Sequence, residues 1–155
     1  KVDTRFPIKG VSKGLAVQPK APAIVQADLW TEPVAVKHLG ILENDKSLLN
    51  AYVSYFESLG YEVHPIPHTE PEFKNSLLSI PPLDFILSDF RLGDEDGVYF
   101  IETLREEFNE NIPACIVTAD TSPQHLSMFK ELQIEVLYKP IDIHSVSEFI
   151  ANRLR

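Results

Sequence analysis

Short apolar segments alternate with helix-like segments five times along the sequence after residue 36. The apolar segments are residues 38–42, 61–66, 83–88, 114–117 and 134–138. Hydrophobic residues at the spacing of amphipathic helices follow them over residues 46–59, 70–79, 98–108, 122–132 and 145–154. Strands joined by helices run parallel with right-handed crossovers. The alternation therefore predicts an α/β fold of the doubly wound type, a five-stranded parallel sheet with helices on both faces.

Finer patterns predict which strands are central and where helices begin and end. The third and fourth apolar segments are continuous rather than alternating, which indicates central strands that are covered on both faces. Gly60 is a typical helix end, and Pro123 is allowed in a first helical turn. We expect residues 90–97 to form a loop. One face of the first helix carries Leu48, Leu49, Tyr52, Val53, Phe56 and Leu59.

The first 35 residues differ from the rest of the chain. Prolines and glycines interrupt every apolar run there, a pattern that is typical of linkers. We therefore expect residues 1–35 to be a linker or tail and residues 36–155 to be one domain. Trp30 is expected to pin the linker to a surface, with contact to a partner as the alternative.

Charge is spread unevenly and excludes some classes of partner. The formal net charge is −9, with +2 on residues 1–35 and −11 on residues 36–155. An acidic domain repels phosphate backbones, so we expect no nucleic-acid partner. The apolar runs are too short to span a bilayer and no signal peptide is present, so we expect no direct membrane insertion of this segment.

Cysteine and histidine usage is sparse. The single cysteine, Cys115, excludes an internal disulfide and a cysteine-based zinc site, and its apolar neighbours indicate a buried side chain. No pair of histidines has the sequence spacing of a metal site, and none lies in a helical phospho-acceptor motif. We expect surface or edge positions, and no autophosphorylation from ATP, for His38, His64, His68, His125 and His144.

Polar residues stand where four of the predicted strands end. They are Glu43-Asn44-Asp45, Asp89, Thr118-Ala119 and Lys139-Pro140. The carboxyl ends of parallel strands meet at one edge of the sheet, where ligands of such folds bind. Clustered carboxylates repel one another unless a cation intervenes, and Mg²⁺ prefers oxygen ligands. Together with an ammonium and a hydroxyl, such carboxylates can accept a phosphoryl group.

Two other phosphate-binding classes do not fit. No G-x-G-x-x-G follows the first strand, which excludes a dinucleotide-binding fold, and there is no P-loop. A flavodoxin-like cofactor site is also disfavoured, because Glu43-Asn44-Asp45 would repel a phosphate unless a metal were bound.

Four motifs in this order resemble the receiver domain of two-component signalling. The motifs are residues 41–45, 87–97, 116–119 and 137–140, and the resemblance covers residues 38–154. It implies a flavodoxin-like (βα)5 fold with strand order 2-1-3-4-5. It also implies a function: transfer of a phosphoryl group from phosphohistidine onto an aspartate, with Mg²⁺ as cofactor.

The resemblance assigns roles residue by residue. Asp89 is the phospho-acceptor, Thr118 the switch hydroxyl and Lys139 the lysine that pairs with phosphate. Ala119 is the small residue beside the switch, and Gly97 ends the loop after the acceptor. A cis bond is implied before Pro140. The implied Mg²⁺ ligands are Glu43, Asn44, Asp89 and the backbone carbonyl of Arg91.

Two positions depart from the family pattern. Asn44 replaces the usual second aspartate, which removes a charge and should lower Mg²⁺ affinity, while Asp45 is expected to cap the following helix. Val136 stands where the family often has a rotating aromatic. Tyr138 lies on the same strand face. It either takes part of that switch role or packs under the last helix.

The resemblance is strongest to receivers at the C-terminus of hybrid sensor histidine kinases. Residues 4–8 are similar to the last strand of a kinase ATP-binding lobe. The implied partners are a histidine kinase core, in the same or another chain, and a histidine phosphotransfer protein. We expect this segment to be cytoplasmic, whether or not the parent kinase is anchored in a membrane. The segment itself would catalyse only its own aspartyl phosphorylation and dephosphorylation. The resemblance therefore does not decide whether the segment is an enzyme, whereas the implied parent chain is a hybrid histidine kinase. The alternative is a pseudo-receiver that only binds proteins.

Overall fold

The computed structural model describes residues 35–155 of the 155-residue chain. The predicted linker, with Trp30 and the kinase-like residues 4–8, lies outside the described residues except for Ala35. The strands are β1 (His38–Leu42), β2 (Glu62–Pro65), β3 (Phe85–Asp89), β4 (Arg91–Leu92), β5 (Glu95–Asp96), β6 (Ala114–Thr118) and β7 (Glu135–Tyr138). The helices are α2 (Lys46–Ser58), α3 (Glu72–Ser76), α4 (Gly97–Glu107), α5 (Pro123–Glu131) and α6 (Ile143–Arg153).

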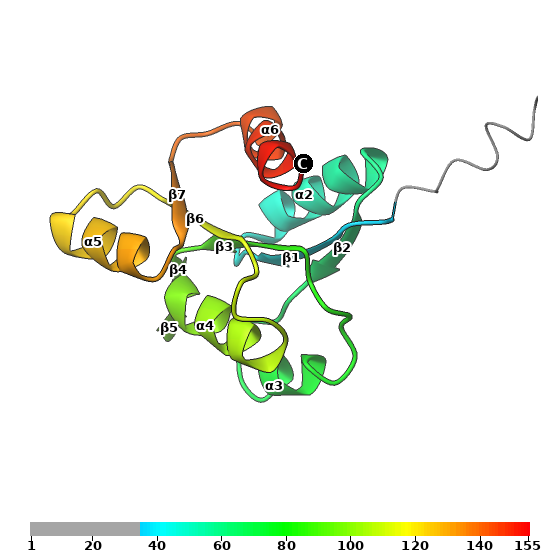
Figure 1. The fold of residues 1–155 in the computed structure, drawn as a ribbon, viewed down its shortest axis with the longest axis horizontal. Helices are drawn as coiled ribbons and strands as arrows, with labels where there is room; N and C mark the ends of the chain where they lie inside the picture. The colour runs from blue at the N-terminus through cyan, green and yellow to red at the C-terminus, as the bar shows by residue number, and fades with distance from the viewer. Residues whose placement is uncertain (1–34) are drawn as a thin grey trace, which may run out of the picture. The chain divides into compact units, whose positions relative to one another are not determined.

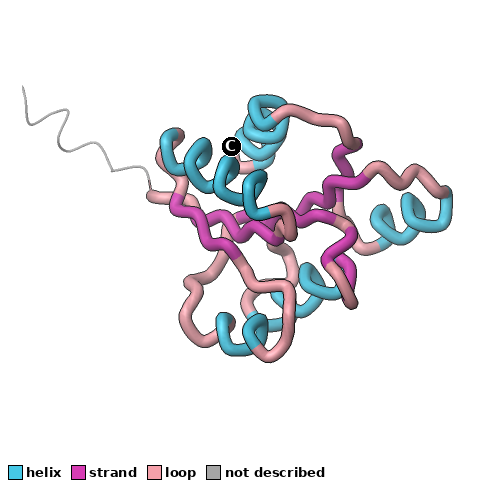
Figure 2. Tube along the Cα trace, turned by 180° about the vertical axis from the view of Figure 1, so that it is seen from behind, coloured by secondary structure: helices cyan, strands magenta, loops and turns pink. Residues whose placement is uncertain are grey.

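The main sheet is parallel and five-stranded, in the order β2-β1-β3-β6-β7. This is the predicted order 2-1-3-4-5, so the doubly wound, flavodoxin-like fold is confirmed. Helices α2 and α6 cover one face of the sheet, and α3, α4 and α5 cover the other (Figure 1). The view from behind shows the same sandwich of helices around the sheet (Figure 2). β3 and β6 are buried along their whole length, as their continuous apolar sequences predict.

Each face of the sheet has its own hydrophobic core. One core is built by aromatic residues of three helices, Phe73, Phe100 and Phe129, against the sheet. The other joins Phe56 of α2 to Val146 and Ile150 of α6, and also contains Cys115, which is buried as expected. The two cores together bury β3 and β6 at the centre of the sheet.

The structure corrects some sequence-based boundaries. The second helix is short, Glu72–Ser76 rather than residues 70–79. The first helix ends at Ser58, before Gly60, so Leu59 lies beyond its buried face and is 52% exposed. Leu59 is the C-cap, so its predicted place on the apolar face of the helix was wrong. Gly60 follows it with a φ of 96°, as its role as a helix end predicts.

The predicted loop over residues 90–97 contains a hairpin. Strands β4 and β5 pair antiparallel, with Arg91 opposite Asp96 and Leu92 opposite Glu95. Gly93 has a φ of 92° at the first turn position, where a two-residue hairpin requires a positive φ. The helix then begins at Gly97, with the Asp96 side chain accepting a hydrogen bond from the Tyr99 N–H at 3.1 Å. Strands of two residues are too short to produce an alternating pattern.

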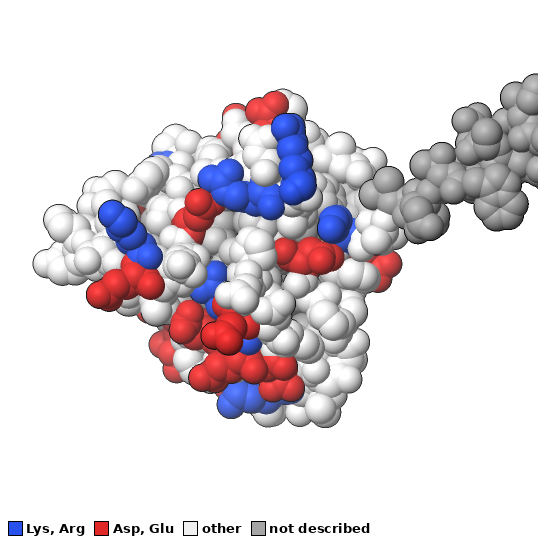
Figure 3. All heavy atoms as spheres, in the orientation of Figure 1, with Lys and Arg blue, Asp and Glu red and all other residues white. Residues whose placement is uncertain are grey.

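Acidic side chains gather over α4 on the face seen in Figure 3. Glu106 and Glu107 are exposed on this helix. These two carboxylates belong to a solvated, acidic face of the helix. Among residues 35–155 no helix has both the length and the apolar composition needed to cross a membrane.

A buried arginine closes the end of α5. The Arg105 guanidinium donates to the carbonyls of Ile112 at 3.0 Å, Leu132 at 2.7 Å and Gln133 at 2.9 Å. Gln133 has a φ of 55°, which is unusual for a residue with a side chain. Burial lowers the pKa of Arg105. The guanidinium thus supplies three donors to carbonyls at the end of α5 and before β6.

Replacing this donor should destabilise the fold. Arg105→Met keeps much of the side-chain volume but leaves three carbonyls without their donor. We expect a loss of about 2–4 kcal/mol in the free energy of unfolding, measured by urea denaturation. Arg105→Lys is the matched control and should lose less, because one ammonium keeps the charge but not the planar fork. Equal stability of the methionine variant and the native protein would contradict the role of this side chain.

Candidate functional site

The register of the sheet brings the predicted site residues to one edge. Leu42 pairs with Ser88, so the next residues, Glu43 and Asp89, lie side by side at the carboxyl ends of β1 and β3. Asp89 in turn pairs with Val117 of β6. Thr118 is the last residue of β6. Lys139 follows β7, and its N–H donates to the Thr118 carbonyl at 3.0 Å. Asp89 and Thr118, from two central strands, therefore lie at one edge with Glu43 and Lys139.

Asp89 and Lys139 form the central ion pair of this edge. The Lys139 ammonium lies 2.8 Å from Oδ1 of Asp89, and the Phe90 N–H donates to the same oxygen at 3.1 Å. Asp89 is 8% exposed, whereas the Lys139 side chain is 41% exposed. One oxygen of a buried carboxylate thus accepts from both a partly exposed ammonium and a backbone N–H, and its second oxygen takes part in neither bond.

Glu43 is a second buried carboxyl beside this pair. Burial raises the pKa of Glu43, and the negative charge of Asp89 raises it further. The N–H of Asp45, which donates to Oε2 at 3.0 Å, and the charge of Lys139 oppose the rise in pKa. One ammonium faces two carboxyls, so negative charge is in excess here. Two carboxylate side chains in this setting are a donor set that fits a hard divalent cation.

Asp45 caps the following helix, as the sequence predicts, whereas the role of Asn44 as a metal ligand stays a prediction. The Asp45 side chain caps α2, accepting from the N–H groups of Ser47 at 2.9 Å and Leu48 at 3.2 Å. Asn44 is exposed and lines a cleft above the sheet edge. The cleft is lined by Asn44, Asp89, Phe90, Arg91, Thr118, Ala119, Asp120 and Lys139. The structure therefore brings Asn44, Arg91 and Ala119 to the same cleft as Asp89.

The loop after β6 carries a polar network that the sequence analysis missed. The Thr118 hydroxyl accepts from the Asp120 N–H at 3.0 Å. The Asp120 carboxylate in turn contacts His125 at 2.8 Å and the exposed Arg91 guanidinium at 3.2 Å. A hydrogen bond from the Ser122 N–H at 2.8 Å is the main reason that the pKa of Asp120 is lowered. The Asp-x-Ser sequence at 120–122 was the available signal.

Two of the residues named for the switch, Val136 and Tyr138, lie on β7 before Lys139. Val136 is half-buried and packs against the core that contains Phe129. Tyr138 is 45% exposed, so the expectation that it packs under the last helix was wrong. It lines a surface groove together with Leu126 and Phe149. The switch role of Tyr138 stays a prediction. The Lys139–Pro140 bond is cis, as the resemblance implies.

Gly97 is required because α4 begins against the end of β3. A Cβ at this position would lie 2.5 Å from the Asp89 carbonyl and 2.7 Å from Oγ of Ser88. The Gly97 N–H also donates to the Phe90 carbonyl at 2.7 Å. The helix start therefore lies directly against the segment that presents the Asp89 carboxylate.

Gly97→Ala should destabilise the protein. Helix propensity alone would make alanine up to about 1 kcal/mol more stable than glycine. The contact with backbone atoms predicts the opposite sign, a loss of about 1–3 kcal/mol. Urea denaturation measures the sign directly. A stabilised alanine variant would contradict the close approach.

Comparisons with known proteins agree on the fold. No protein-family model matches the sequence, and no curated protein matches it. A CheY-like receiver domain protein from Methanospirillum hungatei is similar in structure, with a TM-score of 0.67, 21% identity, and coverage of 77% of this chain and 94% of the other. The chemotaxis protein CheY4 from Vibrio cholerae gives a TM-score of 0.66 at 19% identity, covering 76% of this chain and 98% of the other.

A receiver domain from the hybrid histidine kinase CckA is also similar. Its TM-score is 0.60 at 19% identity, with coverage of 76% of this chain and 99% of the other. Identities at this level show a shared fold and not a shared activity. This chain has the fold of response-regulator receiver domains.

Proposed function

We propose that residues 36–155 are a working receiver domain that accepts a phosphoryl group from phosphohistidine onto Asp89. The observation that carries the proposal is the 2.8 Å contact between Lys139 and a buried Asp89 at the carboxyl edge of the sheet. Thr118 ends the neighbouring strand at the same edge. A carboxylate nucleophile, a cation and a hydroxyl in one cleft are the groups that phosphoryl transfer requires.

The reaction exchanges one bond to phosphorus for another. An Asp89 oxygen attacks phosphorus as the bond between phosphorus and the histidine nitrogen breaks. The imidazole keeps the proton on its other ring nitrogen and leaves as neutral imidazole, with the electron pair of the broken bond. The Lys139 ammonium, already beside Asp89, can then bond an oxygen of the transferred group. The Thr118 hydroxyl can donate to another oxygen. Both interactions neutralise charge that develops on the phosphoryl oxygens.

The proposed Mg²⁺ ligands are Glu43, Asn44, Asp89 and the backbone carbonyl of Arg91. The fit rests on two observations: burial and then the charge of Asp89 raise the pKa of Glu43, and the set consists of oxygen donors, which Mg²⁺ prefers. When bound, the ion would neutralise negative charge on the carboxylates and on the phosphoryl oxygens. Asn44 supplies a carbonyl oxygen without a charge, so it is the weak member of this set.

The loop after β6 is the proposed route from phosphorylation to a partner. Thr118 now accepts a hydrogen bond from the Asp120 N–H. Drawing Thr118 and Ala119 toward a phosphoryl group would disturb that bond, and with it the contacts of Asp120 to His125 and Arg91. His125 lies on α5, which borders the groove that contains Val136 and Tyr138. The change would therefore reach this groove.

The biological setting that we propose is a phosphorelay. A histidine kinase core, in this chain or another, would supply the phosphoryl group, and a histidine phosphotransfer protein would exchange it. The C-terminal part of a hybrid sensor kinase is the proposed parent, on the sequence resemblance described above. Similarity to the CckA receiver is compatible with this setting.

Phosphorylation by a small phosphodonor tests the proposal. With acetyl phosphate and Mg²⁺, intact mass should show one added phosphoryl group on the 155-residue chain, and none without Mg²⁺. Asp89→Asn should abolish the gain, because the amide is not a nucleophile for phosphorus. Asp94→Asn is the matched control, since it removes an exposed carboxylate of the β4–β5 turn. No gain at any Mg²⁺ concentration would favour the alternative, a pseudo-receiver that binds partners without phosphorylation.

Asn44→Asp should strengthen Mg²⁺ binding. A third carboxylate at the cleft adds attraction worth about 1.4 kcal/mol, which is about tenfold in the dissociation constant. Calorimetric titration at fixed ionic strength measures the change. Asn50→Asp adds the same charge on an exposed position of α2 and is the matched control. An equal gain in both variants would show that net charge, rather than a ligand at position 44, sets the affinity.

A further inference from the structure

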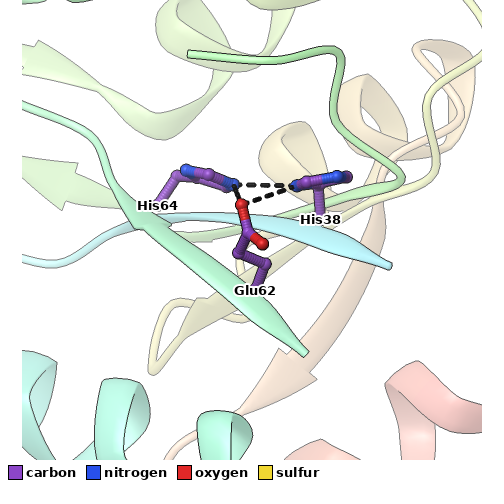
Figure 4. A group of neighbouring side chains, drawn as sticks. All are labelled: His38, Glu62 and His64. Atoms are coloured by element: carbon purple, nitrogen blue, oxygen red, sulfur yellow. Dashed lines mark hydrogen bonds and ion pairs between the residues drawn. The ribbon is translucent and has the colours of Figure 1, made fainter. Parts of the chain in front are cut away.

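A cluster of side chains that can ligate a metal ion lies at the amino ends of β1 and β2, opposite the candidate functional site. His38 is the first residue of β1, Glu62 is the first residue of β2, and His64 follows two residues later. The parallel register pairs His38 with Glu62 and Gly40 with His64. Since side chains alternate along a strand, all three side chains point to one face of the sheet. Figure 4 shows the two rings and the carboxylate facing one another.

The three ligand atoms are already at the separations of a coordination sphere. Nδ1 of His38 lies 3.0 Å from Nε2 of His64. Oε1 of Glu62 lies 3.6 Å from the first nitrogen and 3.8 Å from the second. A point equidistant from three atoms at these separations is about 2.0 Å from each, which is the length of zinc–imidazole and zinc–carboxylate bonds. A cation could therefore bind with little movement of the side chains.

The backbone holds this geometry in place. The His38 N–H donates to the Asp84 carboxylate at 2.7 Å, and the Asp84 N–H donates back to the His38 carbonyl at 2.8 Å. The Glu62 N–H donates to the Lys37 carbonyl at 2.9 Å. Such anchoring lowers the cost of ordering the ligands when an ion binds.

The surroundings favour an ion over the present contacts. A Cβ at Gly40 would meet Ile66 and Leu83 at 2.7 Å, so apolar side chains border the cluster on its inner side. Glu62 is exposed and leaves an approach from solvent. Without a cation, the N–H of one imidazole must donate a hydrogen bond to the bare nitrogen of the other, across 3.0 Å. A cation would instead accept lone pairs from both nitrogens and the carboxylate.

We propose that His38, His64 and Glu62 form a binding site for a divalent transition-metal ion of the zinc type. Two imidazoles and one carboxylate are a common zinc donor set, with a fourth position open to water. Imidazole nitrogens favour Zn²⁺, Ni²⁺ or Cu²⁺ over Mg²⁺, which prefers oxygen. The site is therefore distinct in chemistry from the acidic edge. It is also distinct in place, about 16 Å away along β1 from Glu43. A bound ion would tie the edge strand β2 to β1.

Calorimetric titration of the full 155-residue chain with zinc chloride tests the site. We expect one zinc ion per chain, with an affinity that does not change when excess Mg²⁺ occupies the acidic edge. His38→Gln and His64→Gln should each abolish this binding. Co²⁺ in place of Zn²⁺ should give the visible absorption of a four-coordinate nitrogen and oxygen site, which the same variants should lose.

Two further variants keep the test decisive. Glu62 is exposed on an edge strand, so Glu62→Gln should fold normally. It should weaken zinc binding by more than about tenfold, because even residues that only hydrogen-bond to metal ligands contribute that much to metal affinity. His144 lies 3.5 Å from Glu148 on the surface of α6 and is the matched control, so His144→Gln should bind zinc like the native protein. Zinc binding that survives in both His38→Gln and His64→Gln would overturn the proposal. Zinc affinity that falls as Mg²⁺ rises would also overturn it.

Discussion

The candidate site depends on the hydrogen bonding of β3 between β1 and β6. This strand is buried along its length and is paired in parallel on both sides. The pairing fixes which residue of each neighbour stands beside Asp89. A shift of one residue would turn every side chain of β3 to the opposite face and would remove Asp89 from the cleft. The two hydrophobic cores, one on each face of the sheet, hold this register in place.

The same edge carries an electrostatic imbalance. Asp89 and Glu43 are buried side by side, and Lys139 is the one cation that faces both in the described part of the chain. Burying like charges is unfavourable unless an opposite charge offsets them. Packing of the rest of the domain must therefore supply the stability that this edge lacks. Because a divalent cation would offset this excess of negative charge, the imbalance favours cation binding at the edge.

Strand β1 connects two sites of different character. Its last residue precedes Glu43 at the oxygen-rich edge, and its first residue is His38 in the nitrogen-rich cluster. Hard oxygen ligands and imidazole ligands select different metal ions, so the two ends need not compete. Away from both sites, the hydrogen bonds of Arg105 hold the end of α5 close to the loop that precedes β6. Thr118 and the loop that carries Asp120 lie at the other end of β6, and this loop leads to the start of α5.

The sequence alone determined the fold class, the order of the elements and the residues at the strand ends. These features are local: periodicity along a segment sets which face is buried, and the residue after a strand lies at the sheet edge whatever the distant chain does. Asp89, Glu43, Thr118 and Lys139 could therefore be predicted. The two-residue strands of the hairpin could not, because they are too short to produce a pattern.

Only the tertiary structure decided what depends on register between distant segments. His38 and His64 are 26 residues apart, and no spacing rule relates them. They meet because β1 and β2 pair in one particular alignment. Arg105 likewise donates to a carbonyl 28 residues away, because the packing of α4 against the end of α5 brings the two together. The exposure of Tyr138 likewise depends on how the last helix is placed over β7. Such contacts are set by the packing of whole elements, which local sequence patterns do not encode.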